Sequence, residues 1–239
     1  MLTISSLSLT DKSEIIKEKS KHKIVINTIN AHSFNMARKD DIFEFALKTS
    51  DILLPDGISI VMAKRMIDRE KFVRFTGFDL FNLELTMLNE KGGKCFFLGS
   101  DEKTLCKIKN RVETYFPMVK AETFSPPFKS NFSQKENEII VSKINSFIPD
   151  LLFVGMTAPK QEKWVAENRD KLNVKGPICT VGAVFDFYSG NVRRAPKLVC
   201  NIGFEWLWRL LSEPKRLWKR YLLGNIEFIK NILSEYLSK

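Results

Sequence analysis

Short, almost uninterrupted apolar runs alternate along the chain with longer stretches in which apolar positions recur every three or four residues. The apolar runs predict six β-strands. Three of these runs, CFFLGS, DLLFVGM and PICTVG, are apolar almost throughout and reach a glycine, as expected of strands buried on both faces. The expected strands are Lys23–Ile29, Ile52–Leu54, Lys94–Leu98, Met118–Thr123, Leu151–Val154 and Pro177–Val181.

The stretches with helical periodicity lie between these strands. Strands and helices that alternate at this spacing are typical of an α/β domain with a Rossmann-like, largely parallel sheet and flanking helices. Ligands bind such sheets at the carboxyl ends of the strands, so we expect the functional residues directly after each apolar run. The expected helices are Ile58–Ile67, Phe78–Asn89, Glu102–Tyr115, Lys135–Phe147 and Lys160–Lys171.

The chain changes character near residue 193. Residues 193–239 hold ten Lys and Arg against four Asp and Glu, which is most of the formal net charge of +10, and three of the four tryptophans. Around residues 215–222 the basic and the apolar side chains fall on opposite sides of a helical wheel. We therefore expect an α/β domain over residues 1–192 and a basic, amphipathic, helical appendage over residues 193–239.

The pattern of the appendage predicts three helices. Proline favours the first turn of a helix and glycine the position after the last, so Pro214 is expected to open the second helix and Gly224 to close it. The three expected helices are Cys200–Leu211, Lys215–Leu222 and Asn225–Leu237.

Composition narrows the class of protein. The 239 residues are 44% hydrophobic and 28% charged, which excludes wholesale disorder, a collagen-like fibre and a disulfide miniprotein. Four widely spaced cysteines and two histidines resemble no zinc site, and reduced cytosolic thiols are expected. We find neither a signal peptide nor an apolar run long enough to span a membrane, so a soluble or peripheral protein is expected. The positive charge favours an anionic partner, which composition leaves open among nucleic acid, a membrane surface and a phosphorylated ligand.

Polar residues follow several of the expected strands. Asp56 opens the helix after the second strand, where an aspartate is most often a helix cap but can also serve as a general base. Arg74 lies just before another helix start, either in solvent or facing an anion, and Thr76 or Asp79 can cap that helix. Gly99, with the serine after it, suits a phosphate or ribose but also a plain turn. The sequence lacks G-x-G-x-x-G, the P-loop motif and D-x-D.

Nine short motifs follow one another in a specific order, although each alone is common. They are Thr28-x-Asn30, Pro55-Asp56-Gly57, Arg74-x-Thr76-Gly77-x-Asp79, Phe97-Leu98-Gly99-Ser100, Gly155-x-x-x-Pro159-Lys160-Gln161-Glu162-x-Trp164, Val181-Gly182-Ala183-x-Phe185-Asp186, Arg194-Ala195-Pro196, Glu205-Trp206-x-x-Arg209-Leu210 and Glu213-Pro214-x-Arg216. From Thr28 to about Tyr221, this series resembles the WecB/TagA/CpsF family of glycosyltransferases, glycosyltransferase family 26.

The resemblance implies that a sugar, N-acetylmannosamine or a related hexose, is moved from a UDP-sugar to a sugar on polyprenyl diphosphate, with inversion at the anomeric carbon. It also implies bacterial surface-polysaccharide assembly by a peripheral protein at the cytoplasmic face of the cell membrane. Asp56 matches the family's catalytic base, which takes the proton of the acceptor hydroxyl. Without D-x-D, no metal or other cofactor is expected, and cationic side chains and helix dipoles would balance the leaving group.

Other residues receive roles from the same resemblance. Thr28 and Asn30 are expected beside the sugar and phosphates of the donor, and Arg74 in contact with substrate. Gln161 is expected to bond the uracil, the ribose or the acceptor, whereas Glu162 is as readily a structural cap or partner.

Two glycines and two arginines complete the expected site. Gly155 and Gly182 would let the nucleotide approach the backbone, or would simply form tight turns. Arg216 and Arg220, on the basic face of the appendage, would bind diphosphate and offset charge on the departing UDP, unless that face is merely solvated. The appendage would complete the site and rest against lipid headgroups.

Several alternatives stay open. The donor could be UDP-glucose or UDP-glucuronic acid, and a homo-oligomer is neither implied nor excluded. His32, after the first motif, is more readily a solvated or hydrogen-bonded histidine than a site residue. Two different classes are a dehydrogenase or methyltransferase, disfavoured by the missing glycine motif, and a non-enzymatic module that binds membrane or nucleic acid. Against that module, the positive charge is concentrated in the appendage, so no nucleic-acid partner is expected.

Overall fold

The structure is a computed structural model, and it describes residues 2–11, 13, 15 and 23–238. Six strands form one parallel sheet in the order β2-β1-β6-β5-β3-β4. The expected α/β fold is confirmed, and each expected strand is present to within two residues at either end. The strands are β1 (Val25–Ile29), β2 (Ile52–Pro55), β3 (Gly93–Gly99), β4 (Val119–Phe124), β5 (Leu151–Gly155) and β6 (Ile178–Thr180).

The five helices expected between the strands are also confirmed, and the last of them ends in a 3₁₀ turn, η1 (Arg169–Lys171). They are α4 (Ile58–Ile67), α5 (Gly77–Lys91), α6 (Glu102–Tyr115), α7 (Gln134–Phe147) and α8 (Lys160–Asn168). Three further helices, which the periodicity did not predict, are α2 (Ala31–Ala37), α3 (Asp41–Lys48) and α9 (Val184–Tyr188). They have eight residues or fewer, so they offer at most about two turns of pattern.

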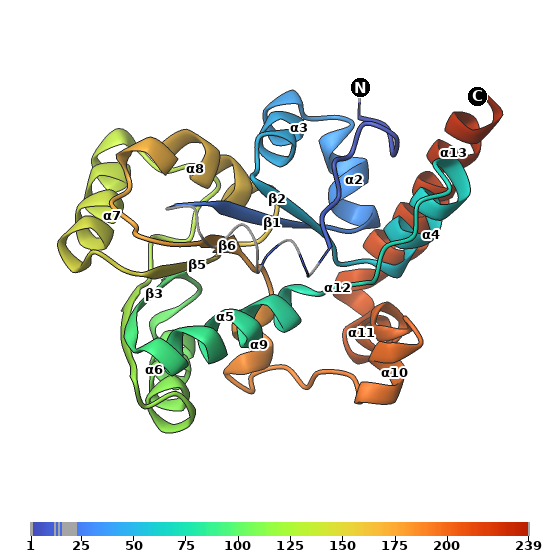
Figure 1. Cartoon of the computed structure of the whole chain (residues 1–239). Helices are drawn as coiled ribbons and strands as arrows, with labels where there is room; N and C mark the ends of the chain where they lie inside the picture. The colour runs from blue at the N-terminus through green and yellow to red at the C-terminus, as the bar shows by residue number, and fades with distance from the viewer. Residues whose placement is uncertain (1, 12, 14, 16–22, 239) are drawn as a thin grey trace.

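Helices cover the sheet on both faces (Figure 1). On one face, α5, α6 and α9 pack their apolar side chains against the strands, and the ring of Phe81 is tilted against those of Phe153 and Phe97. On the other face, α7 and α8 pack around Phe96, Leu98 and neighbouring strand residues. Burial on both faces explains why the central strands are apolar throughout.

A third hydrophobic cluster joins the two ends of the chain. It holds Leu2 and Ile4, residues of α2, α3 and α4, and Phe228 and Ile232 from the last helix, α13 (Gly224–Leu237). The rings of Phe34 and Phe228 meet edge to face at 5.4 Å between centroids. Part of the 193–239 segment is therefore buried together with the first elements of the chain, and its status as a separate appendage stays a prediction.

The helices of this segment differ from the expectation in two places. The expected helix Cys200–Leu211 is two helices, α10 (Lys197–Asn201) and α11 (Glu205–Ser212), because Gly203 turns the chain with a φ of +82°. Pro214 does open a helix, α12 (Pro214–Trp218), but Gly224 does not close one.

Instead, the chain stays helical from Pro214 to Leu237 through a π-helical turn, η2 (Lys219–Leu223). Gly224 has helical angles, φ −64° and ψ −37°, and its carbonyl accepts a hydrogen bond from Asn35 Nδ2 at 2.7 Å. Packing of this helix against α2 and α4 thus outweighs the weak helix preference of glycine. Over the part of the chain described here, no helix has the length and apolar character needed to cross a membrane.

Candidate active site

Asp56 lies at the carboxyl end of β2, directly beside the end of β1. Its backbone N–H donates to the carbonyl of Ile29 at 3.0 Å, which ties the two strand ends together. The helix that follows is capped by Gly57 and receives no hydrogen bond from a side chain, so Asp56 is not its cap. The carboxyl group is left available to act at the edge of the sheet where ligands bind.

Asn30 holds its position next to Asp56 by capping α2. Its Oδ1 accepts the backbone N–H groups of His32 and Ser33, and its Nδ2 points to Asp56 Oδ2 at 3.4 Å. Burial raises the pKa of the Asp56 carboxyl, the positive charge of Arg74 lowers it, and the carboxylate of Glu205 raises it again. A carboxylate with a raised pKa accepts a proton more readily, as a general base must.

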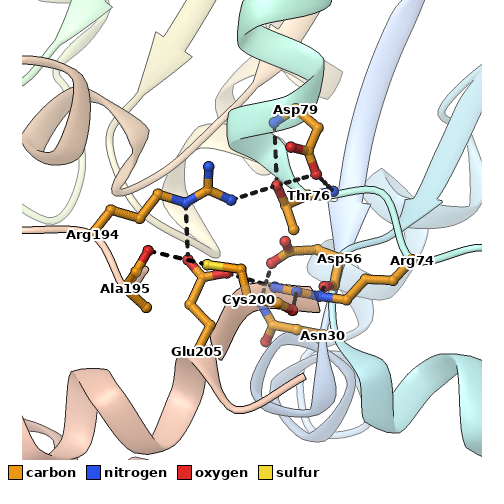
Figure 2. Close-up of polar contacts among 9 residues, drawn as sticks. All are labelled: Asn30, Asp56, Arg74, Thr76, Asp79, Arg194, Ala195, Cys200 and Glu205. Carbon is orange, nitrogen blue, oxygen red and sulfur yellow. Dashed lines mark hydrogen bonds and ion pairs between the residues drawn. The ribbon is translucent and has the colours of Figure 1, made fainter. Parts of the chain in front are cut away.

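Arg74 makes all of its hydrogen bonds in this structure to the protein itself. Its Nε donates to the backbone carbonyl of Asp56 at 2.7 Å, and its two terminal nitrogens donate to the carbonyl of Cys200 at 2.8 Å and to Glu205 Oε2 at 2.7 Å. Figure 2 shows this guanidinium between the Asp56 loop and Glu205 of α11. Arg74 is therefore not simply solvated, although it also lines the cavity beside Asp56, and its expected contact with substrate stays a prediction.

Glu205 has a second cationic neighbour, Arg194, whose Nε lies 3.5 Å from Glu205 Oε1. Arg194 also donates to Thr76 Oγ1 at 3.3 Å (Figure 2). Its guanidinium lies over the ring of Phe78, 4.1 Å from the centroid. Thr76 and Asp79 form a capping box at the start of α5, so the expected structural role of these two residues is confirmed. Glu205 thus connects α11 to the loop of the sheet domain that carries Arg74 and to the segment before α10 that carries Arg194.

A cavity of about 570 Å³ opens beside Asp56, between the ends of β1 and β2, α4 and the C-terminal helices. The end next to Asp56 is polar and includes His32, Arg209 and Arg220. The remainder is apolar and lies between α4 and α13, which run side by side in Figure 1. Its apolar lining includes Met62, Ala63, Met66, Phe228, Ile229, Ile232 and Leu233.

Arg209 and Arg220 bring positive charge into this cavity. The Nε atom of each is buried without a hydrogen-bond partner, and neither takes part in an ion pair with another residue that the structure describes. Burial lowers the pKa of Arg220, and the nearby charge of Arg209 lowers it further. Two close, unpaired guanidiniums form a favourable site for a diphosphate.

Arg220 was predicted from the sequence as a site residue, whereas Arg209 and Glu205 were not. Both belong to the Glu205-Trp206-x-x-Arg209-Leu210 motif, so their spacing was visible. The contacts of Glu205 with Arg74 and of Arg209 with the cavity could not be read from that motif. His32 also lines the cavity, where burial and the charge of Arg220 lower its pKa to about 4 and keep the imidazole neutral at pH 7.

Gln161 and Glu162 lie elsewhere on the same edge of the sheet, outside the lining of this cavity. Gln161 Oε1 accepts the backbone N–H of Met156 at 3.3 Å and that of Gly182 at 3.0 Å, and its Nε2 donates to Glu162 Oε1 at 2.8 Å. Gln161 thereby ties the loop after β5 to the loop after β6. Burial raises the pKa of Glu162 to about 7.

Two of the expected glycines are required by the protein's own packing. A Cβ at Gly99, where φ is +123°, would come within 2.4 Å of the carbonyl oxygen of Gly155. A Cβ at Gly155 would lie 2.6 Å from the ring of Phe185. These contacts explain why glycine is required at both positions even without a ligand. The expected approach of a nucleotide to Gly99, Gly155 and Gly182 stays a prediction.

Thr28 and Arg216 also lie outside the lining of the cavity. Thr28 is a half-buried residue of β1 opposite Leu54 in the sheet. Arg216 is exposed, and its guanidinium makes two hydrogen bonds to Glu213, at 2.6 and 2.8 Å. The structure therefore separates Arg216 from Arg220, although the sequence places both on one basic face.

Among the residues that the structure describes, no three His, Cys, Asp or Glu side chains are grouped so that they could hold a metal ion. What the cavity does offer is a carboxylate of raised pKa beside two unpaired guanidiniums. This arrangement suits a transfer reaction in which a hydroxyl loses its proton and a phosphate-bearing substrate needs a cationic partner.

Comparison with known proteins agrees with this chemistry. The profile described as "Glycosyl transferase WecG/TagA/CpsF family" matches residues 2–239, and the chain belongs to this family of glycosyltransferases. The resemblance inferred from the nine motifs is thereby confirmed.

Two Bacillus relatives are each named N-acetylglucosaminyldiphosphoundecaprenol N-acetyl-beta-D-mannosaminyltransferase. The protein of Bacillus subtilis (strain 168) is 31% identical over 83% of this chain and 75% of its own. That of Bacillus spizizenii (strain ATCC 23059 / NRRL B-14472 / W23) is 32% identical over 78% of this chain and 70% of its own.

Proposed function

We propose that this glycosyltransferase moves an N-acetylmannosamine-type hexose from a UDP-sugar to a sugar carried on polyprenyl diphosphate, with inversion at the anomeric carbon. The observation that carries the proposal is the cavity itself, in which Asp56 lies beside two unpaired arginines and in front of an apolar channel. The names of the two Bacillus relatives support the same donor sugar and the same kind of lipid-linked acceptor.

In the proposed reaction, Asp56 accepts the proton of the acceptor hydroxyl while its oxygen attacks the anomeric carbon of the donor. The bond between that carbon and the phosphate oxygen breaks, and UDP leaves with the electron pair. A single carboxylate suffices for such a displacement, since the attacking oxygen replaces the leaving group on the opposite face. Asn30, fixed by its capping bonds, orients the Asp56 carboxylate through the contact at 3.4 Å.

We propose that no divalent metal takes part, since the sequence has no D-x-D motif. Arg209 and Arg220 have guanidinium atoms without protein partners in the cavity, and we expect them to hold the diphosphate of the acceptor close to Asp56. Helix N-termini at the strand ends would balance the charge on the departing UDP. We expect the nucleotide of the donor over the strand ends at Gly99, Gly155 and Gly182, with Thr28 and Gln161 nearby.

We further propose that the protein acts as a peripheral protein on the cytoplasmic face of the membrane, in the assembly of a bacterial surface polysaccharide. Support comes from the exposed surface of the C-terminal helices, where basic Lys215 and Lys219 lie near the half-exposed Leu222 and Leu223. Basic residues attract anionic lipids, and the apolar ones can enter the headgroup layer.

A donor screen tests the proposed function. The protein is incubated with UDP-N-acetylmannosamine, UDP-N-acetylglucosamine, UDP-glucose or UDP-glucuronic acid and a short-chain N-acetylglucosaminyl diphosphate lipid, in EDTA and in Mg²⁺. We expect a disaccharide product, detected by mass, with UDP-N-acetylmannosamine and at the same rate in EDTA. Product from UDP-glucose or UDP-glucuronic acid alone would correct the donor, and absence of product with every donor would refute the proposal.

A further inference from the structure

The apolar part of the cavity forms a groove between α4 and α13 that the proposed chemistry at Asp56 does not itself require. Its walls are Met62 and Met66 of α4 and Phe228, Ile229 and Leu233 of α13. We call it the α4/α13 groove. It is continuous with the polar end of the cavity, where Arg220 lies eight residues before Phe228, about two helical turns along the C-terminal helix.

The spacing of the wall residues follows the helix. Asn225, Ile229 and Leu233 are four residues apart on α13, so their side chains form a row along one side of that helix. Eight residues at 1.5 Å each give a groove wall of about 12 Å. The row starts at polar Asn225, five residues after Arg220, and continues with apolar Ile229 and Leu233.

The groove also exposes large apolar side chains. Met62 is 64% exposed, Ile229 55% and Leu233 49%, which leaves hydrophobic surface facing water along both walls. Connected apolar surface of this kind marks a place where another apolar group binds. Because Arg209 and Arg220 lie at the polar end of the same cavity, an apolar group bound in the groove is expected to be attached to a diphosphate.

We propose that the α4/α13 groove binds the first isoprenyl units of the lipid-linked acceptor, while Arg209 and Arg220 bind its diphosphate. The inference rests on the proposed function, because it assigns the cavity to the acceptor and leaves the donor nucleotide to the ends of β3, β5 and β6. A diphosphate at the arginines places its sugar toward Asp56 and its lipid toward the groove. A uracil and ribose there would leave polar groups against methionine, isoleucine and leucine side chains.

Binding of two soluble diphosphates tests the groove without any transfer step. Farnesyl diphosphate and butyl diphosphate carry the same charged group, and calorimetry in detergent-free buffer gives the Kd of each. Since each additional buried CH2 group tightens binding, we expect the farnesyl compound to bind at least about tenfold more tightly. Equal Kd values for the two compounds would overturn the proposal.

A matched pair of variants locates the lipid. Ile226 and Ile229 are both on α13 and are 52% and 55% exposed, but only Ile229 lines the cavity. Ile229→Gln should raise the Kd of farnesyl diphosphate about fivefold and leave that of butyl diphosphate unchanged, whereas Ile226→Gln should change neither. Equal weakening by both variants would indicate general adhesion to an apolar surface and would also overturn the proposal.

The outcome stays separate from that of the proposed function. If the N-acetylglucosaminyl diphosphate lipid is not turned over with any donor, but farnesyl diphosphate binds tightly in a way that depends on Ile229, the groove proposal is supported and the proposed reaction is refuted. If transfer occurs but farnesyl diphosphate and butyl diphosphate bind with equal Kd, the proposed reaction is supported and the groove proposal is refuted.

Discussion

Two groups of polar side chains, one buried and one half-buried, lie at the carboxyl edge of the sheet, and they differ in what their polar atoms face. Gln161 and Glu162, after β5, bond to each other, and Gln161 also holds the backbone at the ends of β5 and β6. Asp56, Arg209 and Arg220, near β2, line an open cavity, and both arginines have an Nε atom with no partner.

This difference indicates that Gln161 and Glu162 stabilise the fold, whereas Arg209 and Arg220 are available to bind a ligand. A buried polar group that bonds within the protein stabilises loops and needs nothing else. A buried guanidinium with unused donors carries an electrostatic cost, which an anionic ligand would relieve. We therefore expect changes after β5 to alter stability, and changes beside the cavity to alter activity.

The largest expected effect is on activity, at Asp56. Asp56→Asn removes the proposed base while keeping the size of the side chain, so kcat should fall by about 10²–10⁴-fold. The melting temperature should change little, since the carboxyl group does not cap α4. A variant that keeps more than about a third of the wild-type kcat would contradict the assignment of Asp56 as base.

The matching test after β5 is one of stability. Burial raises the pKa of Glu162 from its ordinary value of 4.5 to about 7. Protonation of Glu162 therefore contributes fully to the free energy of unfolding below pH 4.5, and this contribution is lost as the pH rises through 7. At pH 8 the loss amounts to about 3 kcal/mol, which Glu162→Gln avoids. Urea unfolding should therefore show the variant gaining stability relative to the wild type between pH 5 and pH 8. A constant difference across that range would show that Glu162 does not titrate there.

A smaller effect on activity distinguishes the two arginines of the basic face. Arg220→Ala removes charged hydrogen bonds to the bound diphosphate and should lower kcat/KM about tenfold to a hundredfold. Arg216→Ala, on the same helix, loses an exposed pair with Glu213 and should stay within about threefold. The measurement is a steady-state assay with a soluble acceptor. Equal losses would place Arg216 in the site as well, as the sequence suggested.

The smallest effect expected is spectroscopic. Because the pKa of His32 is lowered to about 4, its imidazole should stay neutral down to about pH 5. NMR of the ring nitrogens, assigned with His32→Asn, measures this directly. In Arg220→Ala the pKa should move upward, since one of the charges that lowers it is gone. An ordinary value near 6.5 in the wild type would mean that the cavity is more open to water than the structure indicates.

Much of the fold and part of the site could be predicted from the sequence. Strands such as β3 and β5 are buried on both faces, so each is a short apolar run that ends in glycine, and this combination distinguishes them from the longer, periodic helices. Asp56 could be found because it follows a strand whose carboxyl end must lie at the ligand edge of a parallel sheet. The family could be recognised from the order of nine motifs.

Other features depend on residues far apart in the chain. Arg74 meets Glu205 across 131 positions, and Gly155 lacks a side chain because the ring of Phe185 lies against it. No local pattern encodes such contacts, since each depends on how the elements pack. The tertiary structure alone therefore decides which charged side chains hold the protein together and which line its cavity.

The basic helix shows this limit most clearly. The sequence determined that Arg216 and Arg220, four residues apart, share one face of a regular α-helix. In the structure the backbone is helical from Arg216 to Arg220, and the π-helical turn over Lys219–Leu223 shifts only the side chains that follow it. Packing of Tyr221, Phe228 and Ile232 against the rest of the protein decides how this helix is turned toward the body, because it buries those apolar side chains, and in that orientation Arg220 lines the cavity and Arg216 does not.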